Sequence, residues 1–146
     1  GDMFRHMQQA MHYHRRHFRD PDVLPVGRTL QMCTGDGARA LGLAGQIGSL
    51  EAGKKADVTI VDLARPHLYP PNMPLHRLVC FANGNDVHTV IVDGRVALRD
   101  RKPVFVDEAT ILDNARRETE RMMRRAGIEA MTATPPETWG LARRGH

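Results

Sequence analysis

The sequence predicts an α+β fold, with helices before and after a group of strands, and three observations indicate it. Apolar residues recur at helical spacing over residues 2–18 near the N-terminus. Strand-like apolar runs and a tight-turn dipeptide follow in the middle of the chain, between residues 57 and 105. Helical spacing returns over residues 107–127. At 146 residues the chain is long enough for one domain with a modest core.

The N-terminal third is predicted to hold two helices. The apolar positions of the first are Met3, Phe4, Met7, Ala10, Met11 and Phe18. Two prolines in residues 20–25 end it. A second helix is expected over residues 26–41, although "TGDG" at 34–37 disfavours its middle, and Gly42 is expected to cap it. Its expected buried positions are Leu30, Cys33, Ala38 and Leu41.

The middle of the chain is predicted to form the sheet. Residues 57–63, "DVTIVDL", are apolar on both faces, so we expect a strand buried within the sheet. A proline-rich connection and a short helix over residues 75–82 follow. Residues 86–105 are interpreted as two strands that turn at Asp93-Gly94, a dipeptide typical of two-residue hairpins.

The last predicted element is a helix over residues 107–127. Asp107 is its expected N-cap and Gly127 its expected stop. Its apolar face comprises Ile111, Leu112, Ala115, Met122 and Met123. Residues 128–146 lack periodicity and are expected to form a tail that packs through Trp139, if it packs at all.

Composition excludes some functional classes. No apolar run approaches the roughly 18 residues that a membrane span needs, and the N-terminus shows no signal-peptide pattern. The net charge of +4 is scattered, and aromatic residues are only 5%, so a nucleic-acid-binding module is the weakest hypothesis. Cys33 and Cys80 lack CxxC spacing, which favours reduced core thiols in a cytoplasmic protein.

The stretch "HYHRRH" at residues 12–17 raises the question of a metal site. On a strand, His12 and His14 would point to one side, but on a helix they lie about 200° apart and cannot share an ion. His14 and His17 could share a helix face, yet two ligands fall short of the three that catalytic zinc typically has. The isolated histidines are His6, His67, His76, His88 and His146. The sequence also shows no GxSxG elbow and no Gly-rich phosphate loop. No catalytic, cofactor-binding or metal-ligating residue is predicted in this chain.

The most specific stretch is "GQIGSLEAGKKADVTIVDL" at residues 45–63. With "DGARALG" before it and the hairpin "ANGNDVHTVIVDGRVALRD" at 82–100, it resembles the C-terminal signature of the metal-dependent amidohydrolases. The branch is that of cytosine, guanine and S-adenosylhomocysteine deaminases and triazine hydrolases. The resemblance covers about residues 1–125. One departure is Arg101, where the family tends to have glycine. If the turn needs a positive φ there, either the arginine costs around 1 kcal/mol or the turn changes type.

The resemblance implies a fold and a division of the chain. The expected fold is α+β, a fragment with the last helices of a (β/α)₈ amidohydrolase barrel plus the C-terminal strands of its composite β-sandwich. Residues 1–44 would be the terminal barrel helices and 45–106 the sandwich segment with a short inserted helix. Residues 107–127 would be a C-terminal helix, and 128–146 the tail.

The resemblance also implies chemistry. In these enzymes a metal-activated water hydrolyses carbon–nitrogen bonds other than peptide bonds, and the expected reaction is deamination of an N-heterocycle. Zinc or iron is expected in the full-length enzyme and no cofactor in this fragment, because none of the family's metal ligands falls on a residue of this chain. The family's metal aspartate would precede Gly1 by a few residues. The fragment alone is expected to be inactive.

Two further expectations remain open. The expected partners are the N-terminal part of the enzyme or another copy of the chain, with 57–63 or 86–92 near the contact; neither nucleic acid nor membrane is expected. The alternative function, from a different class, is a non-catalytic interaction or scaffold domain that acts through self-association. Dihydroorotase-like, imidazolonepropionase-like and deacetylase branches share the sandwich signature.

Overall fold

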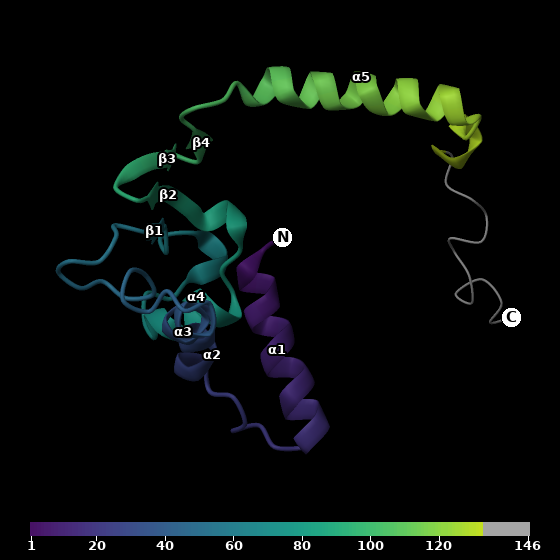
Figure 1. Ribbon diagram of the computed structural model, residues 1–146. Coiled ribbons are helices and arrows are strands. Elements are labelled where there is room, and N and C mark those ends of the chain that lie inside the picture. Colours follow the sequence, from purple (N-terminus) through teal and green to yellow (C-terminus); the bar gives the residue numbers. More distant parts are fainter. Residues whose placement is uncertain (133–146) are drawn as a thin grey trace, which may run out of the picture. The chain divides into compact units, whose positions relative to one another are not determined.

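The computed structural model describes residues 1–132, which divide into one unit over residues 1–105 and a second that begins at Val106 (Figure 1). The predicted α+β class is confirmed: the first unit combines helices with a four-stranded antiparallel sheet. Among the described residues no helix is long and apolar enough to cross a membrane.

The first helix, α1, spans Met3–Phe18 and confirms the prediction for this segment. Asp2 is its N-cap, because the carboxylate accepts a hydrogen bond of 2.9 Å from the Phe4 backbone N–H. The apolar stripe is buried at its centre, at Met7 and Met11. Phe18, at the helix end, keeps 60% of its surface exposed.

The second predicted helix is wrong as a single element, because it divides into α2 (Val26–Cys33) and α3 (Gly35–Ala40). Thr34 breaks it, with φ −122° and ψ −97°, while its hydroxyl donates to the carbonyl of Leu30 at 3.0 Å. Side-chain bonding of this kind competes with the helical ladder, and the neighbouring glycines add backbone freedom.

The predicted buried face of this segment is correct only in part. Ala38 is buried, and Leu30 and Cys33 are partly buried, but Leu41 is 72% exposed. Leu41 lies at the C-cap of α3, beyond the last helical residue, so its side chain leaves the buried stripe. Gly42 has φ +72°, which confirms its predicted role as the helix stop.

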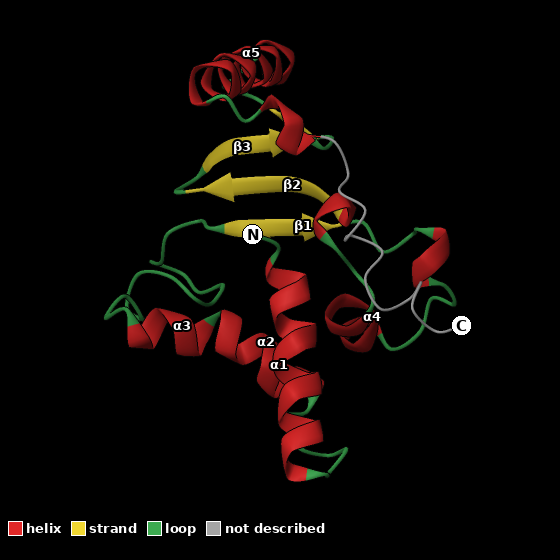
Figure 2. Cartoon of the chain, turned by 90° about the vertical axis from the view of Figure 1, so that its right-hand side faces the viewer, coloured by secondary structure: helices red, strands yellow, loops and turns green. Residues whose placement is uncertain are grey.

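The main core lies where α1, α2 and α4 (Pro74–Cys80) pack together (Figure 2). Its buried residues are Met7, Met11, Val26 and Val79, with Phe4, Leu24, Leu30, Cys33 and Cys80 packed against them. Both cysteines are free and half-buried, and burial raises the pKa of the Cys33 thiol. The predicted short helix over residues 75–82 is confirmed by α4.

The loop from α3 to the sheet packs closely on α3 at one glycine. Gly48 has φ +93°, and a Cβ placed there would lie 2.5 Å from the Cβ of Ala38. Only glycine fits, because both the backbone conformation and the space exclude a side chain. This explains the glycine in the "QIGS" stretch of the signature.

The sheet has the order β1-β2-β3-β4, formed by Val58–Val61, Val87–Val92, Arg95–Arg99 and Lys102–Pro103. β1 pairs only with β2 in the described chain, so the prediction of a strand buried within the sheet is wrong here. Ile60 is 48% exposed. An apolar strand at an open edge is a site that favours pairing with further chain.

Two tight turns connect the last three strands. The predicted hairpin turn is confirmed, with Asp93 at φ +49° and Gly94 at φ +77°. The second turn, at Asp100 and Arg101, leads into β4, a strand that the sequence analysis did not separate from β3. Arg101 has φ +65°, so the expected positive φ occurs without a glycine.

The second unit contains α5, which spans Glu108–Ala126 and confirms the predicted helix. Asp107 caps its start and Gly127, at φ +65°, follows its end, both as predicted. None of the helix residues is buried, and its predicted apolar face is exposed, with Leu112 at 63%. A short 3₁₀ turn, Glu129–Thr132, follows. Trp139 lies outside the described residues.

Candidate functional site

The chemically richest part of the described chain is a group of four residues that we name the Asp86 cluster: Arg65, His67, Asn83 and Asp86. Arg65 and His67 lie on the connection between β1 and α4, where Arg65 is the N-cap of the 3₁₀ turn Pro66–Leu68 and His67 lies within that turn. Asn83 is the N-cap and Asp86 the last residue of a second 3₁₀ turn, Gly84–Asp86, immediately before β2. The cluster therefore joins two segments that are adjacent to neighbouring strands.

Local sequence explains how Asn83 and Asp86 are positioned. The Asn83 side chain accepts a hydrogen bond from the Asn85 N–H at 2.9 Å. The Asp86 carboxylate accepts in return from the Asn83 N–H, also at 2.9 Å. This reciprocal arrangement is a capping box, and it fixes Asp86 before the chain reaches the sheet.

Asp86 is a buried carboxylate, with only 1% of the residue exposed. Its Oδ2 atom lies 3.0 Å from Nε2 of His67, whose side chain is 45% exposed. Its Oδ1 atom lies 3.7 Å from Nε of Arg65, and neither of these two atoms has a hydrogen-bond partner in the described chain. A buried carboxylate is stable only when charges and donors surround it, and Arg65, His67 and Asn83 provide them.

The segment that carries Asn83 and Asp86 is connected to α1. Asp2 accepts a second hydrogen bond, of 3.2 Å, from the N–H of Gly84. Desolvation raises the pKa of Asp2, but hydrogen bonds from the Gly84 and Phe4 amides outweigh it and hold the pKa below its usual value. Gln8 of α1 also reaches the carbonyl of Ala82, at 3.5 Å. The N-cap residue of α1 therefore also makes a tertiary contact.

The same segment, residues 83–86, is also connected to the turn before β4. Arg101 donates from Nε to the carbonyl of Asn85 at 3.2 Å and from Nη2 to Asp62 at 2.6 Å. The hydrogen bond from the Ala64 N–H, and to a smaller extent the Arg101 guanidinium, holds the pKa of Asp62 below its usual value. These contacts offset the strain of an arginine at positive φ, which explains how the chain tolerates Arg101 there.

The histidines of "HYHRRH" lie on a single helix. All lie on α1, so the geometric objection to His12 and His14 is confirmed by the helix. His14 Nδ1 contacts the carbonyl of Ala10 at 2.8 Å, and the ring of His17 makes an edge contact with Phe18. Both side chains make these contacts within their own helix.

Two histidines interpreted as isolated have partners in the structure. His67 pairs with Asp86, and this interpretation was wrong because the partner lies 19 positions away. His88 lies on β2 as expected and contacts Thr89 Oγ1 at 2.9 Å and Asp100 Oδ1 at 2.9 Å. "NGND" at 83–86 was a usable signal for the capping box that sequence reasoning missed. His146 lies outside the described residues.

The donor side chains of the described residues decide whether this part of the chain fits a metal ion. Residues 1–132 contain no group of three or more His, Cys, Asp or Glu side chains that could hold a metal ion. Zinc in catalytic sites is held by three protein ligands of these types. The described residues therefore do not by themselves fit a catalytic zinc.

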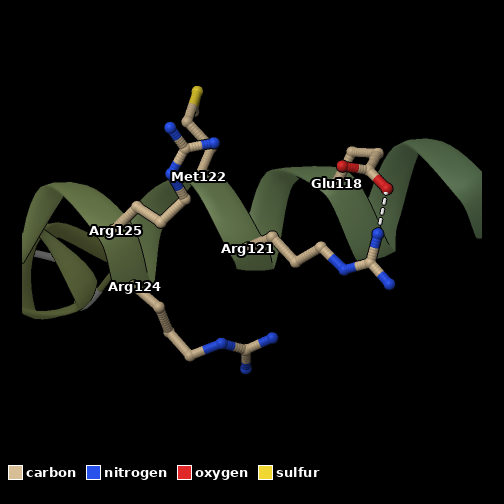
Figure 3. Close-up of a pocket in the computed structure, with 5 residues that line it drawn as sticks. All are labelled: Glu118, Arg121, Met122, Arg124 and Arg125. Atoms are coloured by element: carbon tan, nitrogen blue, oxygen red, sulfur yellow. Dashed lines mark hydrogen bonds and ion pairs between the residues drawn. The ribbon is translucent and has the colours of Figure 1, made fainter.

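A shallow pocket lies on α5, in the second unit. Its described lining consists of Glu118, Arg121, Met122, Arg124 and Arg125, all from one helix (Figure 3). Arg121 pairs with Glu118 at 2.6 Å, and Arg124 extends to the other side of the helix from Met122. These are neighbouring side chains on a solvated helix, and they bring together no nucleophile and base.

Comparison with known proteins gives a consistent result. The model of the family described as "Amidohydrolase family" matches residues 1–97. A 5-methylthioadenosine/S-adenosylhomocysteine deaminase of Desulforudis audaxviator is 48% identical over 104 residues, which are 71% of this chain and 24% of the relative. A 5'-deoxyadenosine deaminase of Methanosarcina mazei is 39% identical over 85% of this chain and 28% of the relative.

Solved structures agree with the sequence relatives. A zinc-bound adenosine deaminase from Xanthomonas campestris matches with a TM-score of 0.80 at 33% identity, over 84% of this chain and 28% of that one. Zinc-bound atrazine chlorohydrolase TrzN from Arthrobacter aurescens matches with a TM-score of 0.64 at 27% identity, over 74% and 24%. The chain spans about a quarter of the length of these relatives.

Proposed function

The chain belongs to the amidohydrolase family, and from this premise we propose that it is the C-terminal portion of a metal-dependent hydrolase of carbon–nitrogen bonds other than peptide bonds. The proposed reaction is deamination of an N-heterocycle by a metal-activated water, with an aminopurine nucleoside as the substrate class. The observation that carries this proposal is the match of residues 1–97 to the family, together with relatives named as deaminases of adenosine derivatives.

In this proposal the chain supplies structural support and the rest of the enzyme supplies the reactive centre. α1 to α3 would cover the end of the barrel, and the strands would complete a composite β-sandwich. The share of the relatives that this chain matches, 24–28% of their length, supports this division. Zinc in the solved relatives supports zinc as the metal of the whole enzyme.

The open edge of the sheet supports a partner for these strands. β1 exposes one edge and keeps Ile60 half-exposed. We propose that the N-terminal part of the enzyme, or another copy of the chain, pairs or packs there. The same edge favours the alternative function, a non-catalytic domain that acts through self-association.

The experiment compares the 146-residue chain with a longer protein that contains it. Each is supplied with zinc and assayed with 5'-methylthioadenosine, S-adenosylhomocysteine, 5'-deoxyadenosine, adenosine and an aminotriazine, by ammonia release. We expect turnover only from the longer protein, abolished by a chelator and restored by zinc. Chelator-sensitive turnover by the 146-residue chain would contradict the proposed division, and an inactive longer protein that binds zinc would contradict the proposed reaction.

A matched control addresses the histidines of α1. The longer protein carrying His12→Ala and His14→Ala should retain its zinc content and its kcat/KM within about twofold, because both side chains lie on different sides of a helix. Loss of zinc in that variant, measured by metal analysis after dialysis, would show that the helical geometry does not decide the role of these residues.

A further inference from the structure

We propose that α5 is a self-association surface, on which α5 of a second copy of the chain packs in the antiparallel direction. This inference is independent of the proposed enzymatic function. It rests on the distribution of apolar and charged side chains along a helix that has well-defined ends and no buried residue among those described.

The first argument is the apolar stripe. At about 100° per residue, a set of small or apolar side chains falls within an arc of about 120° along the whole helix. The set comprises Ile111, Leu112, Ala115, Thr119, Met122, Met123 and Ala126. Ile111, Leu112 and Met122 are 50%, 63% and 58% exposed. A stripe of this width is typical of helices that pack against another element.

The second argument is the polarity of charge along α5. From Asp107 to Asp113 the charged residues are all acidic, whereas from Arg121 to Ala126 they are all arginines. Two copies side by side in the parallel direction would bring like charges together. The antiparallel direction brings the acidic start of each helix to the basic end of the other, and it also opposes the two helix dipoles favourably.

The third argument concerns which charged side chains of α5 already form ion pairs within the helix. Arg116 pairs with Asp113 and Glu120, Arg117 pairs with Asp113, and Arg121 pairs with Glu118, all within the helix. Among residues 1–132, Glu108 and Arg125 take part in no ion pair. They lie at opposite ends of the helix, so only an antiparallel second helix brings a Glu108 near an Arg125.

These arguments define a register. With the pair centred at Arg117, Leu112 faces Met122 of the partner subunit, and Glu108 lies beside Arg125 of the partner subunit. A helix of this length is about 28 Å long, and a two-helix contact of this size is typical of weak, concentration-dependent association. The expected species is therefore a dimer in exchange with its monomer.

The experiment measures the dimer dissociation constant of the 146-residue chain by sedimentation velocity across a concentration series. Leu112→Glu and Met122→Glu each place a carboxylate in the stripe, and each should weaken the dimer by about tenfold or more. Asn114→Glu is the matched control: it introduces the same residue on the polar side of the same helix and should change the constant by less than about twofold.

A charge exchange tests the antiparallel register and does not depend on the apolar variants. Glu108→Arg and Arg125→Glu should each weaken the dimer, and the variant carrying both should recover most of the loss. An equimolar mixture of the two single variants should form a mixed dimer more tightly than either forms with itself. Circular dichroism of each variant establishes that α5 remains helical.

Several results would overturn the proposal. One is a chain that stays monomeric at every concentration. Another is a dimer that Leu112→Glu leaves unchanged, which would place the contact elsewhere, for example at the open edge of β1. A third is a monomer whose melting temperature falls sharply in Leu112→Glu but not in Asn114→Glu, which would show that the stripe packs on its own chain.

Discussion

The two N-capped helices α1 and α5 are similar in local design and differ in the contacts that each makes within its own unit. Each begins at an aspartate that accepts from a backbone N–H two or three positions later, and each is followed by a residue at positive φ. α1 buries Met7 and Met11 against α2 and α4, and Asp2 also binds Gly84, 82 positions away. The side-chain hydrogen bonds recorded for α5 all lie within four residues of sequence.

This difference shows that capping and an apolar face are enough to form a helix, but they do not determine whether the helix packs against the rest of the chain. The ion pairs of α5 join exposed side chains at i+3 and i+4, where solvent screens the charges and each pair adds little to stability. The packing of α1 removes large apolar side chains from water, which contributes several times more per residue. Substitutions of the same kind should therefore have unequal effects in the two helices.

The largest expected difference is between two methionine-to-alanine substitutions. Met11→Ala removes a side chain that is 2% exposed and should lower the free energy of unfolding by about 2–5 kcal/mol. Met122→Ala removes one that is 58% exposed and should change it by less than about 0.5 kcal/mol. Urea unfolding measures both at one protein concentration, low enough to keep the chain monomeric. Equal losses would show that α5 is buried as deeply as α1.

A smaller contrast is expected between two glycines at positive φ in the signature loop. Gly48→Ala should cost about 2–4 kcal/mol, because a Cβ there clashes with Ala38 and the backbone is strained. Gly53→Ala, at φ +89° with no atom within 4 Å of the added Cβ, should cost only the backbone strain of about 1 kcal/mol. Thermal unfolding followed by circular dichroism compares them. Indistinguishable melting temperatures would exclude the close approach of the loop to α3.

The two N-caps offer a comparison of smaller effect. Asp2→Ala removes a cap and the contact to Gly84, so it should lower the stability of residues 1–105 by about 1–2 kcal/mol. Asp107→Ala should reduce the helical circular dichroism signal and leave the main unfolding transition in place, because its contacts are local. A shift of the main transition in Asp107→Ala would indicate that α5 contributes to the core.

The smallest expected effect is the acid dependence of the same two aspartates. The pKa of Asp107 is lowered in the folded chain, first by the Thr110 hydroxyl, and the pKa of Asp2 is lowered as described above. A lowered pKa in the folded state stabilises it above the unfolded value of 3.8, and the stabilisation is lost as pH falls through the folded pKa. Helical signal should decline below about pH 4, less so in Asp107→Asn, whose cap does not titrate.

Much of the secondary structure was predictable, because its determinants are local. The helix over 2–18, the Asp93-Gly94 turn and the helix bounded by Asp107 and Gly127 all depend on contacts within a few residues. The segment 26–41 was not predictable as two helices. The helical spacing of its apolar residues continues across Thr34, so the spacing gives no sign of the break there. β4 was missed for the same reason, since a two-residue strand has no period of its own.

The sequence by itself determined the family signature, the helix caps and the tight turns, since each is encoded by residue type at a short, fixed spacing. Only the tertiary structure decided that His67 meets a buried Asp86, that Asp2 holds Gly84 as well as α1, and that Arg101 is supported by Asp62 and Asn85. Each of these contacts joins residues that are distant in sequence. Such pairs form because packing of the core brings the segments together, and no local preference of either residue specifies the partner.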